Sequence, residues 1–342
     1  MKKSLTFISL LLALLMLFAS CSAEKTDETT VPGQDVPAGT DSTIINVGLL
    51  KGPTGMGAAK LMDDSANGAA KGNYSFRLEG AADVLQSALI SGELDMAALP
   101  VNVVSVLNAK TEGKINILAV NTLGVLYVMS TEDIASVEDL RGKTVLSAGK
   151  GTTAEYAFDY ILEKNGLTAG EDVNVEFASE HAEVISKAAA GGYDTVLLPE
   201  PFVTQMKMQN AGFSTVLDLT DEWEKLGGGL LTMGAIAVRK EFAEQHPGAV
   251  AVFLEEYAES VETVKADTEN AALLIEKYDI AKAAVAKQAL PFCNLTCMTG
   301  EEMKENVSAY LAVLADFNPA AVGGAVPGDS FYYIPENSAD AK

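Results

Sequence analysis

Two glycine-rich segments carry the residues of this chain that are best suited to bind a small polar group. The first reads LLKGPTGMG and contains Lys51, and the second reads SAGKGTTAE and contains Lys150. Each follows an apolar, strand-like run and leads into a helix-like run, so free backbone N–H groups and an ammonium group would face one point. Such a turn could bind an anionic or polar part of a ligand. The alternative is a tight turn whose lysine extends into solvent.

The glycine spacing does not fit the common nucleotide-binding loops. A Walker loop needs Gly, four residues, and then Gly-Lys followed by Ser or Thr. Val137 and Thr144 stand where that first Gly is required, five residues before each Gly-Lys pair of the second region. The spacing of the glycines at 52, 55 and 57 also differs from a dinucleotide fingerprint. Neither segment is therefore predicted to be a nucleotide-binding loop. Both are predicted to be turns whose N–H groups could bind another polar or anionic ligand group.

Helix starts are predicted directly after both turns. Thr54 could cap the first helix, since Thr is a favoured capping residue. Thr152 and Glu155 have the spacing of a capping box at the start of the second helix.

The two segments occupy equivalent places in an internal repeat. Residues 44–102 and 144–202 both read as strand, glycine-rich turn, helix, strand, helix and buried strand. With one gap in the alignment, the Gly, Asp and Pro at 92, 95 and 100 pair with the Gly, Asp and Pro at 191, 194 and 199. Alternating strands and helices predict an α/β fold with parallel strands, and two copies predict two such sheets.

In open α/β sheets, ligands lie beyond the carboxyl ends of the strands. Each copy then offers two corners, at 51–55 and 100–102 and at 147–153 and 199–202, and all four would meet if the two lobes face each other. The candidate ligand-binding residues are Lys51, Gly52, Pro53, Thr54, Gly55, Asn102, Gly149, Lys150, Gly151, Thr152, Thr153, Glu200, Phe202 and Asn294.

Four of these candidates have specific alternatives. Glu200 could accept hydrogen bonds from an amine or an amino-heterocycle, or be a charge at the rim. Phe202 could stack on a planar ligand or belong to the core. Asn102 is its counterpart in the other copy, and Asn294 could reach the cleft or cap a helix.

The amino-terminal residues predict export. Lys2 and Lys3 precede the apolar run 10–18 and the small residues before Cys21, which are the three parts of a signal peptide at 1–20. The last residues resemble the lipobox of bacterial lipoproteins, although Phe18 stands where Leu is usual, and this resemblance implies lipidation of Cys21. The polar segment up to residue 43 would be a disordered tether.

The amino-acid composition limits the classes of molecule that could be direct binding partners of this chain. The formal net charge of −23 argues against nucleic acid or an anionic bilayer surface as direct partners. The chain has two histidines, His181 and His246, in contexts that suggest neither a catalytic triad nor a metal site, so no metal, no cofactor and no enzyme activity are expected. Cys293 and Cys297 could form a disulfide or remain two buried thiols.

The chain resembles the substrate-binding lipoproteins of bacterial ABC importers, in the class that binds nitrate, sulfonates, taurine and thiamine precursors. The resemblance rests on the lipobox and on SVEDLRGKTVL, GGYDTVLLPEPF and VRKEFAEQHPGAVAVFLEEY, in this order. It implies a two-lobed fold of mostly parallel sheets, with lobe 1 at 44–127 and 236–342 and lobe 2 at 128–235. Two hinge crossings would lie near 124–130 and 233–238.

The same resemblance implies a function. The chain would be a monomer outside the cytoplasm, anchored to the membrane through its lipid alone at the cell surface or in the periplasm. It would close on a small polar or planar ligand, such as a sulfonate or an aminopyrimidine, and deliver it to an ABC permease driven by an ATPase. The alternatives are a ligand sensor for a membrane receptor, or an enzyme of this fold related to pyrimidine synthesis.

Overall fold

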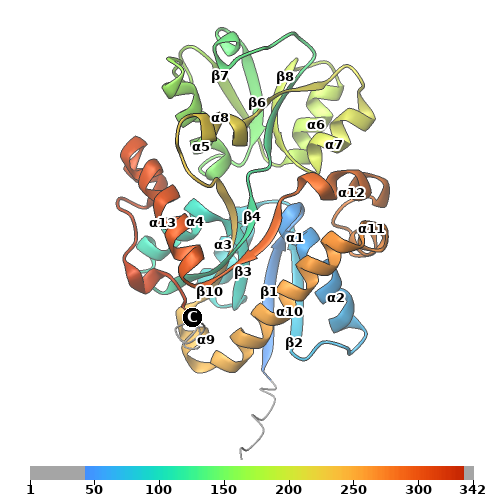
Figure 1. Cartoon of the computed structure of the whole chain (residues 1–342), viewed down its shortest axis with the longest axis vertical. Coiled ribbons are helices and arrows are strands. Elements are labelled where there is room, and N and C mark those ends of the chain that lie inside the picture. Colours follow the sequence, from blue (N-terminus) through green and yellow to red (C-terminus); the bar gives the residue numbers. More distant parts are fainter. Residues whose placement is uncertain (1–42, 335–342) are drawn as a thin grey trace, which may run out of the picture. The chain divides into compact units, whose positions relative to one another are not determined.

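Two mixed β-sheets flanked by helices make up the computed structural model, which describes residues 43–334 (Figure 1). These residues all lie in one compact unit, Thr40–Lys342. The predicted signal peptide, the lipidation site at Cys21 and nearly all of the tether lie outside the described residues. None of the described helices is both long and apolar enough to span a bilayer.

The first sheet has six strands in the order β11-β4-β10-β3-β1-β2. Its central strands β3 and β4 are almost entirely buried and mostly apolar, because helices cover both faces. We call this sheet and its helices the first lobe. The strands are β1 (Ile44–Leu50), β2 (Asn73–Glu79), β3 (Met96–Pro100), β4 (Ile115–Leu123), β10 (Thr232–Arg239) and β11 (Leu295–Met298).

The second sheet has five strands in the order β7-β6-β8-β5-β9, and with its helices it forms the second lobe. Its strands are β5 (Leu126–Ser130), β6 (Thr144–Ala148), β7 (Asn174–Ala178), β8 (Thr195–Pro199) and β9 (Ser214–Asp218).

The internal repeat is confirmed by the pairing of the strands. In each sheet the first strand of the repeat lies between the other two and runs parallel to both, as β1 does between β2 and β3 and β6 does between β7 and β8. Both Gly92 and Gly191 have the left-handed backbone that ends the helix before the third strand.

The two-lobed α/β fold is confirmed, but the sheets are mixed rather than mostly parallel. Strand β10 runs antiparallel to β3 and β4, and β5 runs antiparallel to β8 and β9. Both strands follow a passage between the sheets. The chain enters each sheet from the side at which the neighbouring strands have their carboxyl ends. The entering strand therefore runs antiparallel to those neighbours.

The chain passes from the first sheet to the second between Leu123 and Leu126 and returns between Asp218 and Thr232. Segment 233–238, predicted as a crossing, forms part of β10 in the first sheet. The exact limits of the two lobes stay a prediction.

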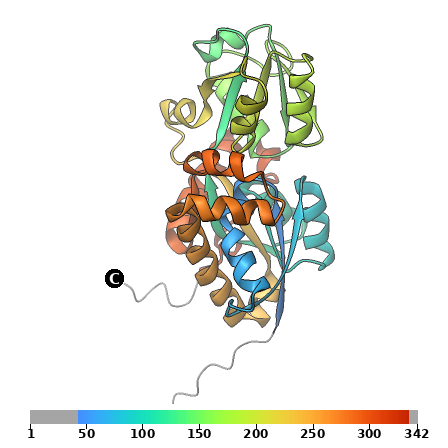
Figure 2. The same cartoon turned by 90° about the vertical axis from the view of Figure 1, so that its right-hand side faces the viewer.

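Helices cover both sheets (Figure 2). The first lobe carries α1 (Pro53–Gly57), α2 (Ala59–Ala66), α3 (Ala82–Ser91), α4 (Val101–Lys110), α9 (Lys240–Gln245), α10 (Pro247–Ala266), α11 (Thr268–Lys277), α12 (Ala283–Ala289) and α13 (Gly300–Phe317). The second carries α5 (Thr153–Lys164), α6 (His181–Ala189), α7 (Phe202–Gln209) and α8 (Leu219–Lys225). Short 3₁₀ turns occupy Val137–Leu140, Leu290–Phe292, Pro319–Val322 and Asp329–Phe331.

Aromatic side chains join the lobes at one side. The ring of Trp223 in α8 lies 5.5 Å from that of Tyr310 in α13, and Tyr160 in α5 lies 5.8 Å from Phe317 in α13. Because Trp223 and Tyr310 are fully buried, the hydrophobic core runs from one lobe into the other.

Candidate functional site

One pair of predicted corners joins the lobes directly. Asn102, at the start of α4, is completely buried. Its Nδ2 donates to the Gly151 carbonyl at 3.2 Å and to the Ala321 carbonyl at 3.1 Å, and its Oδ1 accepts from the Thr153 hydroxyl at 3.1 Å. The predicted ligand groups at this corner therefore satisfy one another, and we call this set of bonds the Asn102 latch.

The turn after β1 differs in detail from the prediction. Gly52, with φ 140°, precedes the five-residue helix α1, which begins at Pro53. The Thr54 cap prediction is wrong, because Thr54 lies inside the helix and its hydroxyl donates to the Leu50 carbonyl at 3.3 Å. A Cβ on Gly55 would lie 2.6 Å from that same oxygen, so the close approach requires glycine.

The turn after β6 has the predicted helix cap. Thr152 is the N-cap of α5, and its hydroxyl oxygen accepts from the N–H of Ala154 at 3.3 Å. Glu155 accepts from the N–H of Gly151 rather than from that of Thr152. Gly149 and Gly151 both have left-handed backbones, which glycine adopts without strain.

The two repeat-related lysines are not brought together. Lys51 forms an ion pair with Asp279 at 2.8 Å. Lys150 is exposed and lies 5.8 Å from the centre of the Phe177 ring in its own lobe. The idea that both ammonium groups serve one ligand therefore has no support in the geometry.

A cavity of about 210 Å³ lies between the lobes, and we call it the interlobe cleft. Lys51, Gly80 and the segment 276–282 line it from the first lobe, and the starts of α6 and α7 line it from the second. Lys51 and Phe202 are the predicted site residues in it. The lining residues are Lys51, Gly80, Glu180, His181, Ala182, Phe202, Gln205, Glu276, Asp279, Ile280, Ala281 and Lys282.

His181 is the residue of this cleft that sequence reasoning missed. Its ring lies against that of Phe202, with 4.9 Å between the ring centres and an angle of 36° between the ring planes, and its Nδ1 is buried with no hydrogen-bond partner among the described residues. Burial lowers the pKa of the imidazole to about 4, so the ring is neutral at physiological pH. The sequence could have indicated His181, because it follows β7. The carboxyl end of the second strand in each copy of the repeat also faces the predicted ligand side of the sheet.

Glu200 lies in a different cavity, of about 380 Å³, which we call the Glu200 cavity. Its carboxylate accepts from the N–H of Thr204 at 3.1 Å and from the Thr204 hydroxyl at 3.0 Å. The carboxylate is thus neither a rim charge nor beside Lys51. The lining residues are Tyr127, Glu200, Val203, Thr204, Lys207, Thr215, Asp218, Gln288 and Phe292.

Asn294 supports the first passage between the sheets, and the two cysteines lie on either side of this residue in the sequence. Asn294 donates from Nδ2 to the Gly124 carbonyl at 2.5 Å, and its own carbonyl accepts from the N–H of Leu123 at 3.1 Å. It caps no helix. Cys293 and Cys297 are both free thiols in the structure, where Cys293 is buried and Cys297 is partly buried, and Cys293 Sγ lies 3.8 Å from Met56 Sδ.

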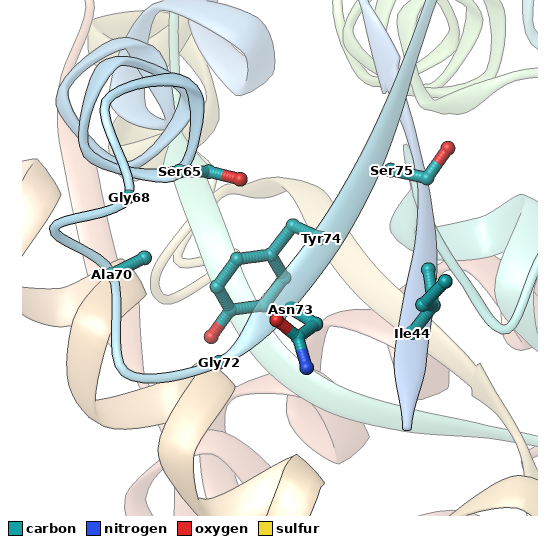
Figure 3. Close-up of a pocket in the computed structure, with 8 residues that line it drawn as sticks. All are labelled: Ile44, Ser65, Gly68, Ala70, Gly72, Asn73, Tyr74 and Ser75. Atoms are coloured by element: carbon teal, nitrogen blue, oxygen red, sulfur yellow. The ribbon is translucent and has the colours of Figure 1, made fainter. Parts of the chain in front are cut away.

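A third cavity, of about 600 Å³, lies at the opposite end of the first sheet (Figure 3). Ile44 and Asn73, which begin β1 and β2, line it, and Tyr74 donates to Glu256 at 2.6 Å beside it. Ligands of open α/β sheets lie at the carboxyl ends of strands, so we do not assign the ligand site here. Within residues 43–334, no group of three or more metal-binding side chains lies together.

The family model described as menaquinone biosynthesis matches residues 72–315, which is more than half of the chain. The chain belongs to this menaquinone biosynthesis family. None of the curated proteins matches the sequence.

Several solved structures have the same fold as this member of the menaquinone biosynthesis family. An ABC transporter protein from Parabacteroides distasonis is 21% identical, with a TM-score of 0.70 over 86% of this chain and 99% of that one. The periplasmic aliphatic sulphonate binding protein SsuA from Escherichia coli is 18% identical, with a TM-score of 0.68 over 85% and 92%. The periplasmic nitrate-binding protein NrtA from Synechocystis PCC 6803 is 15% identical, with a TM-score of 0.60 over 87% and 93%. The fold is therefore that of periplasmic binding proteins.

Proposed function

We propose that this chain is an extracytoplasmic solute-binding protein that captures a small planar ligand in the interlobe cleft and delivers it to an ABC permease. The observation that carries the proposal is the cleft itself, where Lys51 of one lobe faces Phe202 and His181 of the other. Clefts between lobes are common ligand sites, and closure of two lobes on a ligand is a common motion. The fold shared with ABC transporter proteins supports the permease as partner.

The cleft favours a planar ligand that has both an acidic group and a hydrogen-bond donor. The Lys51–Asp279 pair is weak because Asp279 is 87% exposed, so an acidic ligand group can replace Asp279 on the ammonium. The ring of Phe202, with the tilted ring of His181 beside it, offers an aromatic face on which a planar group can stack. Glu180, which forms no ion pair with a described residue, can accept from an amino group.

A thermal-shift screen of the purified chain tests the proposal. The panel contains aromatic amino-sulfonates, aminopyrimidines, thiamine and small aromatic acids, with the non-planar taurine for comparison. A ligand at 100 times its Kd adds about 2.7 kcal/mol of stability, which raises Tm by several degrees. We expect the K51A and F202A variants to lose the shift caused by a planar ligand.

The matched control is K150A, since Lys150 is the repeat equivalent of Lys51 but is exposed outside the cleft. It should respond as the wild type does. The proposal is wrong if no planar compound shifts Tm, or if K150A loses the response while K51A keeps it.

Two observations favour an enzyme as a second candidate. The family model is named for menaquinone biosynthesis, and the neutral imidazole of His181 lines the cleft. Such a ring can take a proton from a bound substrate. If the chain is an enzyme, a compound found by the screen is consumed during incubation, as mass spectrometry would show, and H181A lowers the turnover by a larger factor than it weakens binding.

A further inference from the structure

We propose that the Glu200 cavity is a second ligand site and that it binds a small organic cation with N–H donors, such as a protonated amine. This inference does not rest on the function proposed for the interlobe cleft. The two sites lie on different sides of α7, since Phe202 and Gln205 line the cleft whereas Val203, Thr204 and Lys207 line the Glu200 cavity.

The cavity is built from both lobes. Tyr127 of β5, Thr215 and Asp218 of β9 and the start of α7 come from the second lobe, and Gln288 and Phe292 come from α12 and the following 3₁₀ turn of the first. Its volume of about 380 Å³ suits an organic molecule of several heavy atoms rather than a bare metal ion.

Two carboxyl groups in this cavity lack a cation. Glu200 is 3% exposed, and neither it nor Asp218 forms an ion pair with any described residue, although Lys207 lines the same cavity. Within residues 43–334, only Thr204 donates hydrogen bonds to the Glu200 oxygens, and Asp218 Oδ1 accepts from the N–H of Thr220 at 2.8 Å. Because each carboxylate oxygen has two lone pairs, both groups retain acceptor capacity for ligand N–H donors.

In the protein without a ligand, burial makes ionisation of Glu200 and Asp218 energetically unfavourable. It raises the pKa of Glu200 and the pKa of Asp218, and for Glu200 this effect exceeds the opposing effects of the Thr204 hydrogen bonds and of the Lys207 charge. A bound ammonium group would supply a counterion in direct contact and strengthen the hydrogen bonds.

The remaining walls fit the rest of such a ligand. The Phe292 ring is 55% exposed at the cavity, although large apolar side chains are usually covered, and the Tyr127 ring is half-buried. Aromatic faces attract organic cations, whereas they add nothing for an anion. Thr215 also lines the cavity, and its Oγ1 is buried without a hydrogen-bond partner among the described residues.

Isothermal titration with benzylammonium, benzyl alcohol and benzoate tests the proposal on the purified chain. We expect benzylammonium to bind measurably and the neutral and anionic analogues to bind at least tenfold more weakly. The E200Q and D218N variants should each weaken benzylammonium at least tenfold, whereas E301Q, which removes an exposed carboxylate on α13, should leave its Kd unchanged.

Further variants keep the experiment decisive. If E200Q does not fold, F292A and D218N replace it, because Phe292 and Asp218 are less buried. K51A should not affect benzylammonium, which separates this site from the interlobe cleft. The proposal is overturned if benzyl alcohol binds as well as benzylammonium, if wild type binds neither, or if folded D218N and F292A bind as tightly as wild type.

Discussion

Asp159 on α5 carries a carboxyl group whose acidity the fold changes strongly. Burial, and then the nearby Glu155, raise the pKa of Asp159 from 3.8 to about 7. The folded state therefore holds a proton that the unfolded chain has already lost between about pH 4 and pH 7. The free energy of unfolding should fall as pH rises through this range, by at most about 1.4 kcal/mol per pH unit.

The D159N variant tests this dependence, since its amide cannot titrate. Urea unfolding at pH 5 and at pH 8 should show a smaller loss of stability for D159N than for wild type. Other carboxyl groups whose pKa is raised, such as that of Asp218, change the stability of wild type and of D159N equally. The difference between the two proteins therefore reports the contribution of Asp159. Equal losses in the two proteins would contradict the assignment.

At the scale of residues, local sequence predicts which side chains a turn offers for binding, but not which residues of distant segments those side chains contact. Lys51 and Phe202 were predicted as site residues because they follow strands, and both line the cleft. The partner of Lys51 is Asp279, 228 positions away, and no local pattern relates the two. Lys150 has the same place in the repeat, yet Phe177 beside it gives its ammonium a different neighbour.

At the scale of elements, the repeat could be read because each copy carries its own strand periodicity and helix ends. The order β1, β2, β3 and its copy β6, β7, β8 followed from that pattern. The antiparallel strands β5 and β10 did not, since their direction depends on which sheet edge the chain enters after a passage between lobes.

The Asn102 latch links α4 of one lobe to the start of α5 in the other. Replacing Asn102 with Leu keeps the number and branching of the side-chain heavy atoms but removes the hydrogen-bond partner of the Gly151 and Ala321 carbonyls and of the Thr153 hydroxyl. Each unsatisfied buried group costs about 1–3 kcal/mol, so N102L should lower the free energy of unfolding by about 3 kcal/mol in urea titrations.

Ser105 provides the matched control, because it lies on the same helix and donates to the Val322 carbonyl at 2.7 Å without reaching the second lobe. S105A should lose about 1 kcal/mol. A loss for N102L no larger than that for S105A would show that the bonds between lobes add nothing to stability in solution.

At the scale of the whole molecule, the amino-terminal residues determine where the protein acts. We propose that Cys21 is lipidated and tethers the described body to a membrane outside the cytoplasm, because a charged, apolar and small-residue leader precedes it. The C21A variant should move from the membrane fraction to the soluble fraction, as immunoblotting of fractionated cells would show. A C21A protein that pellets with membranes as fully as wild type would refute the anchor.

Trp223 is the one tryptophan in the sequence, and it lies where the two lobes touch, with its ring 5.5 Å from Tyr310 of the other lobe. Its indole emission depends on the polarity and the quenching groups around it. The protein therefore contains an intrinsic optical reporter of lobe movement, which needs no dye and no labelled cysteine. Opening of the lobes at this contact would admit water to the indole and shift its emission to longer wavelength.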